Sequence, residues 1–77
     1  MHVLLFAGLK EKIGDSSIVL PVEESITAHR LREQLYTSFP RINGEVFQIA
    51  CNEAFVKDDF IIKDTDEVAL IPPVSGG

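Results

Sequence analysis

Residues 26–40 read ITAHRLREQLYTSFP and predict one amphipathic helix, which decides what the rest of the chain can build. Thr27 is a suitable N-cap, and apolar residues then recur every four positions, with Leu31 and Leu35 at the centre of a single stripe. The proline that closes the stretch disfavours a helical conformation at the residue before it, so we expect the helix to cover residues 28–39. A helix with one apolar stripe covers one face of a sheet.

The segments on both sides of this helix predict strands. Before it, apolar residues dominate 2–7 and 17–22, and one or two helical turns over 8–13 would join them into a hairpin-like pair. Pro21 places the second of these strands at a sheet edge, and Asn52–Glu53 predicts a tight hairpin turn after the helix. Further short strands are expected at residues 47–52, 54–56 and 67–71, with an apolar patch at residues 60–62.

This order of elements predicts an α+β domain in the β-grasp arrangement, with a mixed sheet whose final strand is inserted beside the first. A single main helix leaves the second face of the sheet uncovered. Alternate side chains of the first and last strands should form an exposed apolar patch there, which usually indicates a partner. The patch would consist of Leu4, Phe6, Ala69 and Ile71. The alternative is that residues 8–16 and 40–47 fold over it.

Length and composition describe one domain over residues 1–77, with 45% apolar and 25% charged residues. The longest apolar runs are too short to cross a membrane and no secretory signal opens the chain, so we expect a cytoplasmic protein without a membrane partner. The net charge is −5, and all of the excess negative charge lies in residues 45–77. Nucleic acid is therefore not an expected partner, whereas a basic protein surface is.

The sequence contains no recognisable catalytic constellation. His2 and His29 have no nucleophile near them in the sequence, and the single cysteine, Cys51, is expected to be a half-buried apolar residue. The acidic turns Asp58–Asp59 and Asp64–Asp66 lack the glycine and the closing glutamate of a calcium loop, so we expect no metal site. These features favour a carrier, a modifier or a binding module over a free-standing enzyme.

The sequence ends on PPVSGG, residues 72–77, which we expect to be a flexible tail. Gly76 and Gly77 have no Cβ atoms, so their backbone can enter a channel that side chains would block. The carboxylate of Gly77 could be adenylated by another enzyme and passed to a nucleophile such as sulfide or an amine. Fully extended, these six residues reach about 20 Å, and the two prolines limit the conformations lost on insertion. The plainer interpretation is an inert chain end.

Two stretches carry a family resemblance: VLLFAGLKEKIG at residues 3–14 and DEVALIPPVSGG at residues 66–77. With them the chain resembles the small subunit of molybdopterin synthase, a ubiquitin-like sulfur carrier. The resemblance implies that an ATP-dependent activating enzyme adenylates Gly77 and that a sulfur donor converts it to a thiocarboxylate. Gly76 would let the tail thread into the large subunit, where the sulfur passes to cyclic pyranopterin monophosphate and two transfers build the dithiolene of molybdopterin.

The same resemblance implies a heterotetramer in which the large subunit supplies the catalytic residues and this chain, with no bound cofactor, supplies the sulfur. The partner-binding positions would be Phe6, Phe55, Ile71, Pro72, Pro73, Val74 and Ser75. Three alternatives stay open: a thiamine-pathway sulfur carrier, a ubiquitin-like protein modifier, and a β-grasp interaction module with an inert tail. The product distinguishes them, because a carrier forms a thiocarboxylate and a modifier forms an isopeptide bond.

Overall fold

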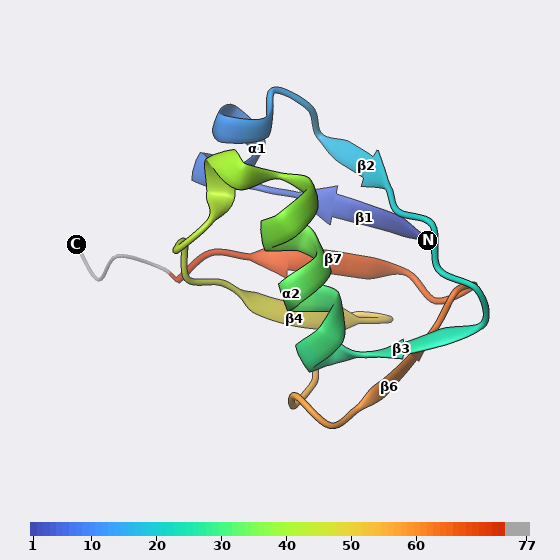
Figure 1. The fold of residues 1–77 in the computed structure, drawn as a ribbon. Coiled ribbons are helices and arrows are strands. Elements are labelled where there is room, and N and C mark those ends of the chain that lie inside the picture. Colours follow the sequence, from blue (N-terminus) through green and yellow to red (C-terminus); the bar gives the residue numbers. More distant parts are fainter. Residues whose placement is uncertain (74–77) are drawn as a thin grey trace.

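Helix α2 lies across one face of a five-stranded sheet in the computed structural model, which describes residues 1–73 (Figure 1). A separate two-stranded sheet lies beside this layer. The elements in chain order are β1 (His2–Leu5), α1 (Ala7–Ile13), β2 (Ser17–Val19), β3 (Ser25–Thr27), α2 (Ala28–Ser38), the 3-10 helix η1 (Pro40–Ile42), β4 (Gln48–Cys51), β5 (Ala54–Phe55), β6 (Ile61–Lys63) and β7 (Val68–Ile71).

The main sheet has the strand order β2-β1-β7-β4-β5. Strand β1 pairs antiparallel with β2 and parallel with β7, and β4 pairs antiparallel with β7. The last strand is thus inserted beside the first, and β2 lies at an edge, as the sequence predicts. The α+β class and the β-grasp arrangement are confirmed. Because β7 is the central strand, the residues that follow it leave from the middle of the sheet.

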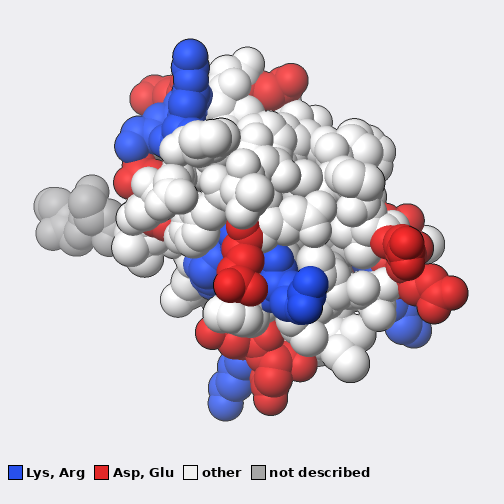
Figure 2. Space-filling view, viewed as in Figure 1, with Lys and Arg blue, Asp and Glu red and all other residues white. Residues whose placement is uncertain are grey.

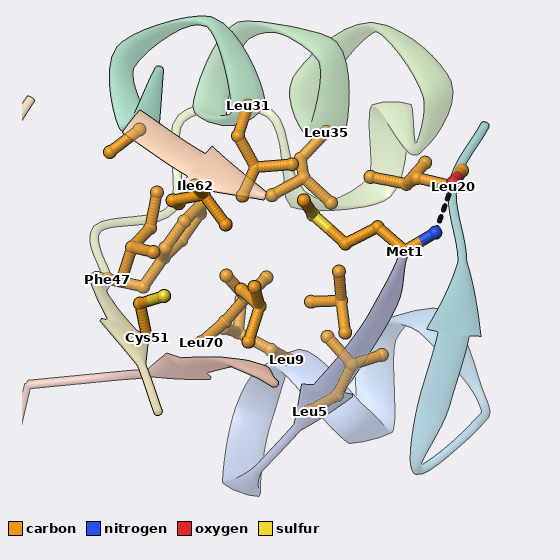
Figure 3. Close-up of a cluster of buried hydrophobic side chains, with 14 of the residues drawn as sticks. Met1, Leu5, Leu9, Leu20, Leu31, Leu35, Phe47, Cys51, Ile62 and Leu70 are labelled. Atoms are coloured by element: carbon orange, nitrogen blue, oxygen red, sulfur yellow. Dashed lines mark hydrogen bonds between the residues drawn. The ribbon is translucent and has the colours of Figure 1, made fainter. Parts of the chain in front are cut away.

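The core lies between α2 and the sheet (Figure 3). Leu31 and Leu35 on the helix and Val3 on β1 have no exposed surface, and Leu5 has almost none. Thr27 caps the helix as predicted, since its Oγ1 accepts a hydrogen bond of 3.2 Å from the backbone N–H of Arg30. The helix ends at Ser38, one residue before the predicted end.

The small sheet was not predicted. Strand β6 pairs antiparallel with β3, with Ile26 opposite Ile62. Within the predicted apolar patch at 60–62, Phe60 and Ile61 are exposed, whereas Ile62 is fully buried in the core. A three-residue strand carries too little periodicity to be recognised, and its partner lies far away in the sequence.

Several strand ends are also shorter than predicted. Strand β1 stops at Leu5 because Ala7 takes a positive φ of 48° and begins α1. Strand β2 stops at Val19, after which the N–H of Leu20 donates to the carbonyl of Met1 and the leucine side chain enters the core. The hairpin turn at Asn52–Glu53 is confirmed, since both residues have positive φ angles of 51° and 70°.

Candidate functional site

The face of the sheet opposite α2 carries an apolar groove of about 380 Å³. Its floor is one row of side chains across four paired strands, because Leu4 lies beside Ala69, Ala69 beside Ala50, and Ala50 beside Phe55. Two alanines in the middle of this row leave a hollow between larger neighbours. The residues that line the groove are Leu4, Phe6, Ala50, Glu53, Phe55, Glu67, Ala69 and Ile71.

The four residues of the predicted patch all line this groove, so the patch is confirmed. The alternative cover by residues 8–16 and 40–47 is wrong, since no residue of either segment lines it. Phe6 lies outside β1, at the N-cap of α1, but it keeps an extended backbone with φ −134° and ψ 155°. Its side chain therefore stays on the side of the sheet that the strand alternation gives it, with 45% of its surface exposed.

Phe55 joins the same groove from the edge strand β5, and 63% of its surface is exposed. The structure thus brings together Phe6, Phe55 and Ile71, the three positions that the family resemblance selects. The groove is also lined by Ala50, Glu53 and Glu67, which were not predicted from the sequence. The register of the predicted hairpin would have indicated Ala50, because Ala50 lies directly opposite Phe55 and so on the same face of the sheet.

Pro72 and Pro73 form the base of the tail, at the end of β7 that lies beside Phe6. Both prolines line two hollows, of about 330 and 400 Å³, and exposed Val46 lines both as well. The larger hollow also includes Phe55 and Ile71, so it continues the apolar groove to the tail. The predicted tail residues Val74, Ser75, Gly76 and Gly77 lie outside the described residues.

Helix α2 holds the segment beside the tail base. The guanidinium of Arg32 donates a 2.7 Å hydrogen bond to the carbonyl of Phe47 and lies 4.7 Å from the centre of that residue's ring. The hydroxyl of Tyr36 donates to the carbonyl of Glu45, whose carboxylate pairs with Lys12. These contacts join residues far apart in the sequence, so no local pattern predicts them.

The opposite end of the groove is organised by Asp66. Its carboxylate accepts hydrogen bonds from the backbone N–H of Lys63 at 2.9 Å, the amide of Asn52 at 3.2 Å and the thiol of Cys51 at 3.5 Å. The Lys63 N–H and then the Asn52 amide hold the pKa of Asp66 below its usual range. Asn52 in turn accepts from the N–H of Glu67 at 3.0 Å, which ties the β4–β5 turn to the start of β7.

Cys51 is buried rather than half-buried, with 4% of its surface exposed. Burial, and then the hydrogen bond to Asp66 and its charge, raise the pKa of the thiol to about 11. The thiolate is the reactive form, so Cys51 is not a nucleophile near neutral pH. This agrees with the prediction that the residue packs rather than reacts.

Within residues 1–73, no three or more His, Cys, Asp or Glu side chains gather in a way that could hold a metal ion. The helices of this part of the chain are all too short or too polar to cross a membrane.

The fold and the groove define a ubiquitin-like β-grasp domain with an open apolar face next to the base of its C-terminal tail. The chain belongs to the ThiS family, whose model matches residues 3–77. It is 44% identical to the molybdopterin synthase sulfur carrier subunit of Dictyostelium discoideum, in an alignment that covers 97% of this chain and 93% of the relative.

Solved structures share the whole fold. A putative molybdopterin converting factor subunit 1 from Pyrococcus furiosus is similar with a TM-score of 0.84 and 25% identity over 95% of each chain. SAMP1 from Haloferax volcanii is similar with a TM-score of 0.81 and 27% identity over 99% of this chain and 97% of that one. A chain from the complex of subunits 1 and 2 of the Helicobacter pylori molybdopterin-converting factor has a TM-score of 0.69 at 24% identity, over 99% of this chain and 96% of that one, and shows the fold alone.

Proposed function

We propose that this chain is the sulfur carrier subunit of a molybdopterin synthase. The observation that carries the proposal is the continuity of β7: its residues line the apolar groove and then run directly into Pro72 and Pro73. A partner docked on the groove therefore receives the tail at one defined edge of the interface. The Dictyostelium relative has this function in its name and aligns over nearly the whole chain.

The proposed chemistry takes place on Gly77. An activating enzyme joins the carboxylate to the AMP of ATP and releases pyrophosphate. Sulfide from a sulfur donor then displaces AMP and leaves a thiocarboxylate. In the large subunit the sulfur passes to cyclic pyranopterin monophosphate, and water restores the carboxylate. This chain positions an activated co-substrate, while the catalytic side chains belong to its partners. We place the reaction in the cytoplasm, where ATP is available.

The large subunit is the proposed occupant of the groove, with Phe6, Phe55 and Ile71 as its main contacts and residues 72–77 in its active site. The Helicobacter pylori structure is a complex of subunits 1 and 2, which is the kind of assembly that we propose here. Two copies of each subunit would make the heterotetramer.

Protein modification is the second candidate function, because SAMP1 of Haloferax volcanii shares the fold. The SAMP1 of Methanosarcina acetivorans, which also shares it, is named small archaeal modifier protein 1. Its product differs from that of a sulfur carrier. A modifier ends as an isopeptide on a lysine, whereas a carrier returns to a carboxylate after each transfer.

The first test is the intact mass of the chain after incubation with the activating enzyme of the same organism, ATP and sulfide. We expect a gain equal to the replacement of one oxygen by sulfur, mapped by fragmentation to Gly77. A variant that lacks Gly76 and Gly77 should show no gain and support no molybdopterin formation, yet bind the large subunit as the full chain does. A ladder of lysine conjugates, or a truncated chain that still supports molybdopterin formation, would show that the proposed function is wrong.

A further inference from the structure

We propose that the apolar groove accepts the large subunit in one orientation because one end of the groove is acidic, and that the partner presents Lys or Arg side chains against Glu53 and Glu67. This proposal rests on the proposed function and adds to it a second kind of contact, at the end of the groove away from the tail. The contact requires a partner surface that is apolar at one end and basic at the other.

The two ends of the groove are fixed by the strands that form it. Glu67 directly precedes β7 and Pro72 directly follows it, so about 16 Å of extended chain separates them. Glu53 lies in the β4–β5 turn, and the N–H of Asn52 in that turn donates a 2.8 Å hydrogen bond to the carbonyl of Glu67. Both glutamates therefore belong to the same end, which we call the turn end. Ile71 and the prolines form the tail end.

The charges differ between these ends. Glu53 and Glu67 are the only charged side chains among the residues that line the apolar groove, and both are exposed. Neither takes part in an ion pair within residues 1–73. The larger hollow at the tail end is lined by uncharged residues alone, and Glu45, which lines the smaller one, is paired with Lys12.

Hydrogen bonds hold the backbone of Glu67 at the turn end. Both backbone polar groups of Glu67 are bonded to Asn52, and Asn52 is also held by Asp66. The carboxylate of Asp66 is used by its own hydrogen bonds, and the nearby charge of Lys63 offsets part of its negative charge, so the acidity of the turn end comes mainly from Glu53 and Glu67. The backbone that carries Glu67 therefore needs no reordering when a partner docks, which lowers the cost of pairing its side chain.

The helix side of the molecule shows no such division. Over the face that carries α2, acidic and basic side chains lie next to each other (Figure 2). On that helix, for example, the carboxylate Oε1 of Glu33 lies 3.5 Å from the imidazole Nε2 of His29. Charges of one sign at the rim of an apolar face steer a complementary partner during the encounter and repel a wrongly turned one. The turn end has this arrangement, so we assign it the role of orienting the partner.

The test compares two charge-reversed chains of equal net charge. Glu53→Lys with Glu67→Lys reverses the turn end, and Glu23→Lys with Glu33→Lys, at exposed positions outside the groove, is the matched control. The association rate with the large subunit of the same organism is measured at low and at high salt, after circular dichroism has shown that each chain is folded. At low salt we expect the turn-end variant to associate at least tenfold more slowly than the unaltered chain, with a rate that no longer falls as salt is added. The control should stay within about twofold.

Basic residues of the large subunit are then changed to Glu one at a time. We expect one such change to restore most of the association rate of the turn-end variant and to slow the unaltered chain. Equal rates for the two charge-reversed chains, or a failure of every reversal to restore the rate, would overturn the proposal while the unaltered chain still binds. A chain that pairs with a second copy through this face, seen as a dimer in sedimentation velocity, would also overturn it. If the unaltered chain does not bind the large subunit at all, the proposed function fails as well, so the two failures are distinguishable.

Discussion

Asp66 connects the turn end of the groove to the rest of the fold through a single carboxylate. Its three hydrogen-bond donors come from β6, from the β4–β5 turn and from β4. An ionised carboxylate can accept all three, whereas a protonated one loses part of that capacity. The charge state of this residue therefore decides how firmly the turn end is held.

This dependence predicts an effect of pH on stability. The pKa of Asp66 is lower in the folded chain than in the unfolded one, so its ionised form stabilises the fold at neutral pH. That contribution is lost as the pH falls below the unfolded-state pKa of about 3.9 and through the folded-state pKa. We expect the urea midpoint of the unaltered chain to fall between neutral pH and pH 3, and that of Asp66→Asn to be lower at neutral pH and to fall less. Asp59→Asn, in an exposed turn, is the matched control. An Asp66→Asn chain with the unaltered pH profile would contradict this account.

Local sequence was enough to predict some of these residues. Thr27 as a cap and the turn at Asn52–Glu53 depend on neighbours within a few positions, and both are confirmed. The bonds of Asp66 to Cys51 and Asn52 join residues 15 and 14 positions apart, and nothing in the sequence marks such a pair. The contact of Arg32 with Phe47 was missed for the same reason, because these residues are 15 positions apart.

At the scale of elements, helix α2 provides most of the cover for the buried face of the sheet. Its apolar stripe was strong enough to predict the helix to within one residue at its C-terminal end. The short strands β3 and β6 were not predicted, because their pairing is a long-range contact between segments of three residues each. Strand alternation, however, placed Leu4, Ala69 and Ile71 correctly on the groove.

The contribution of α2 to the free energy of unfolding can be measured with substitutions at Leu35. This side chain has no exposed surface, so Leu35→Ala removes buried apolar area and leaves a cavity, which costs about 2–5 kcal/mol. A chain of this size has a free energy of unfolding on the order of 4–12 kcal/mol, so the variant should lose a large share of it. Leu35→Met keeps the volume and should cost less than about 1.5 kcal/mol. Urea unfolding gives both values, and a loss below about 1 kcal/mol for the alanine variant would show that α2 is loosely packed.

At the scale of the whole molecule, the two faces of the sheet have separate uses. One face is buried under α2 and provides stability, while the other is left open and leads to the tail. A domain this small buries only a limited part of its surface. Because the apolar groove is left uncovered, the domain lacks the stability that another helix packed on this face would provide. An exposed face of this kind is typical of a protein that functions only when a partner covers it.

This separation predicts that the groove can be damaged without harm to the fold. Phe6 is nearly half exposed and stands at the N-cap of α1, where no side chain caps the helix. Phe6→Asp places a carboxylate there that can accept from the first N–H groups of that helix, so the free energy of unfolding should change by less than about 1 kcal/mol. The same carboxylate would be desolvated under an apolar partner, and we expect the affinity for the large subunit to fall at least tenfold.

Val19→Asp is the matched control, because Val19 is 66% exposed on the edge strand β2 and does not line the groove. It should bind the large subunit as the unaltered chain does. Isothermal titration calorimetry gives the affinities, and urea unfolding shows whether each variant is folded. Equal weakening by both substitutions would mean that added charge, and not the place of Phe6 on the groove, controls binding. Unchanged affinity of Phe6→Asp would move the interface away from this face, and the tail would then reach its partner from a different surface.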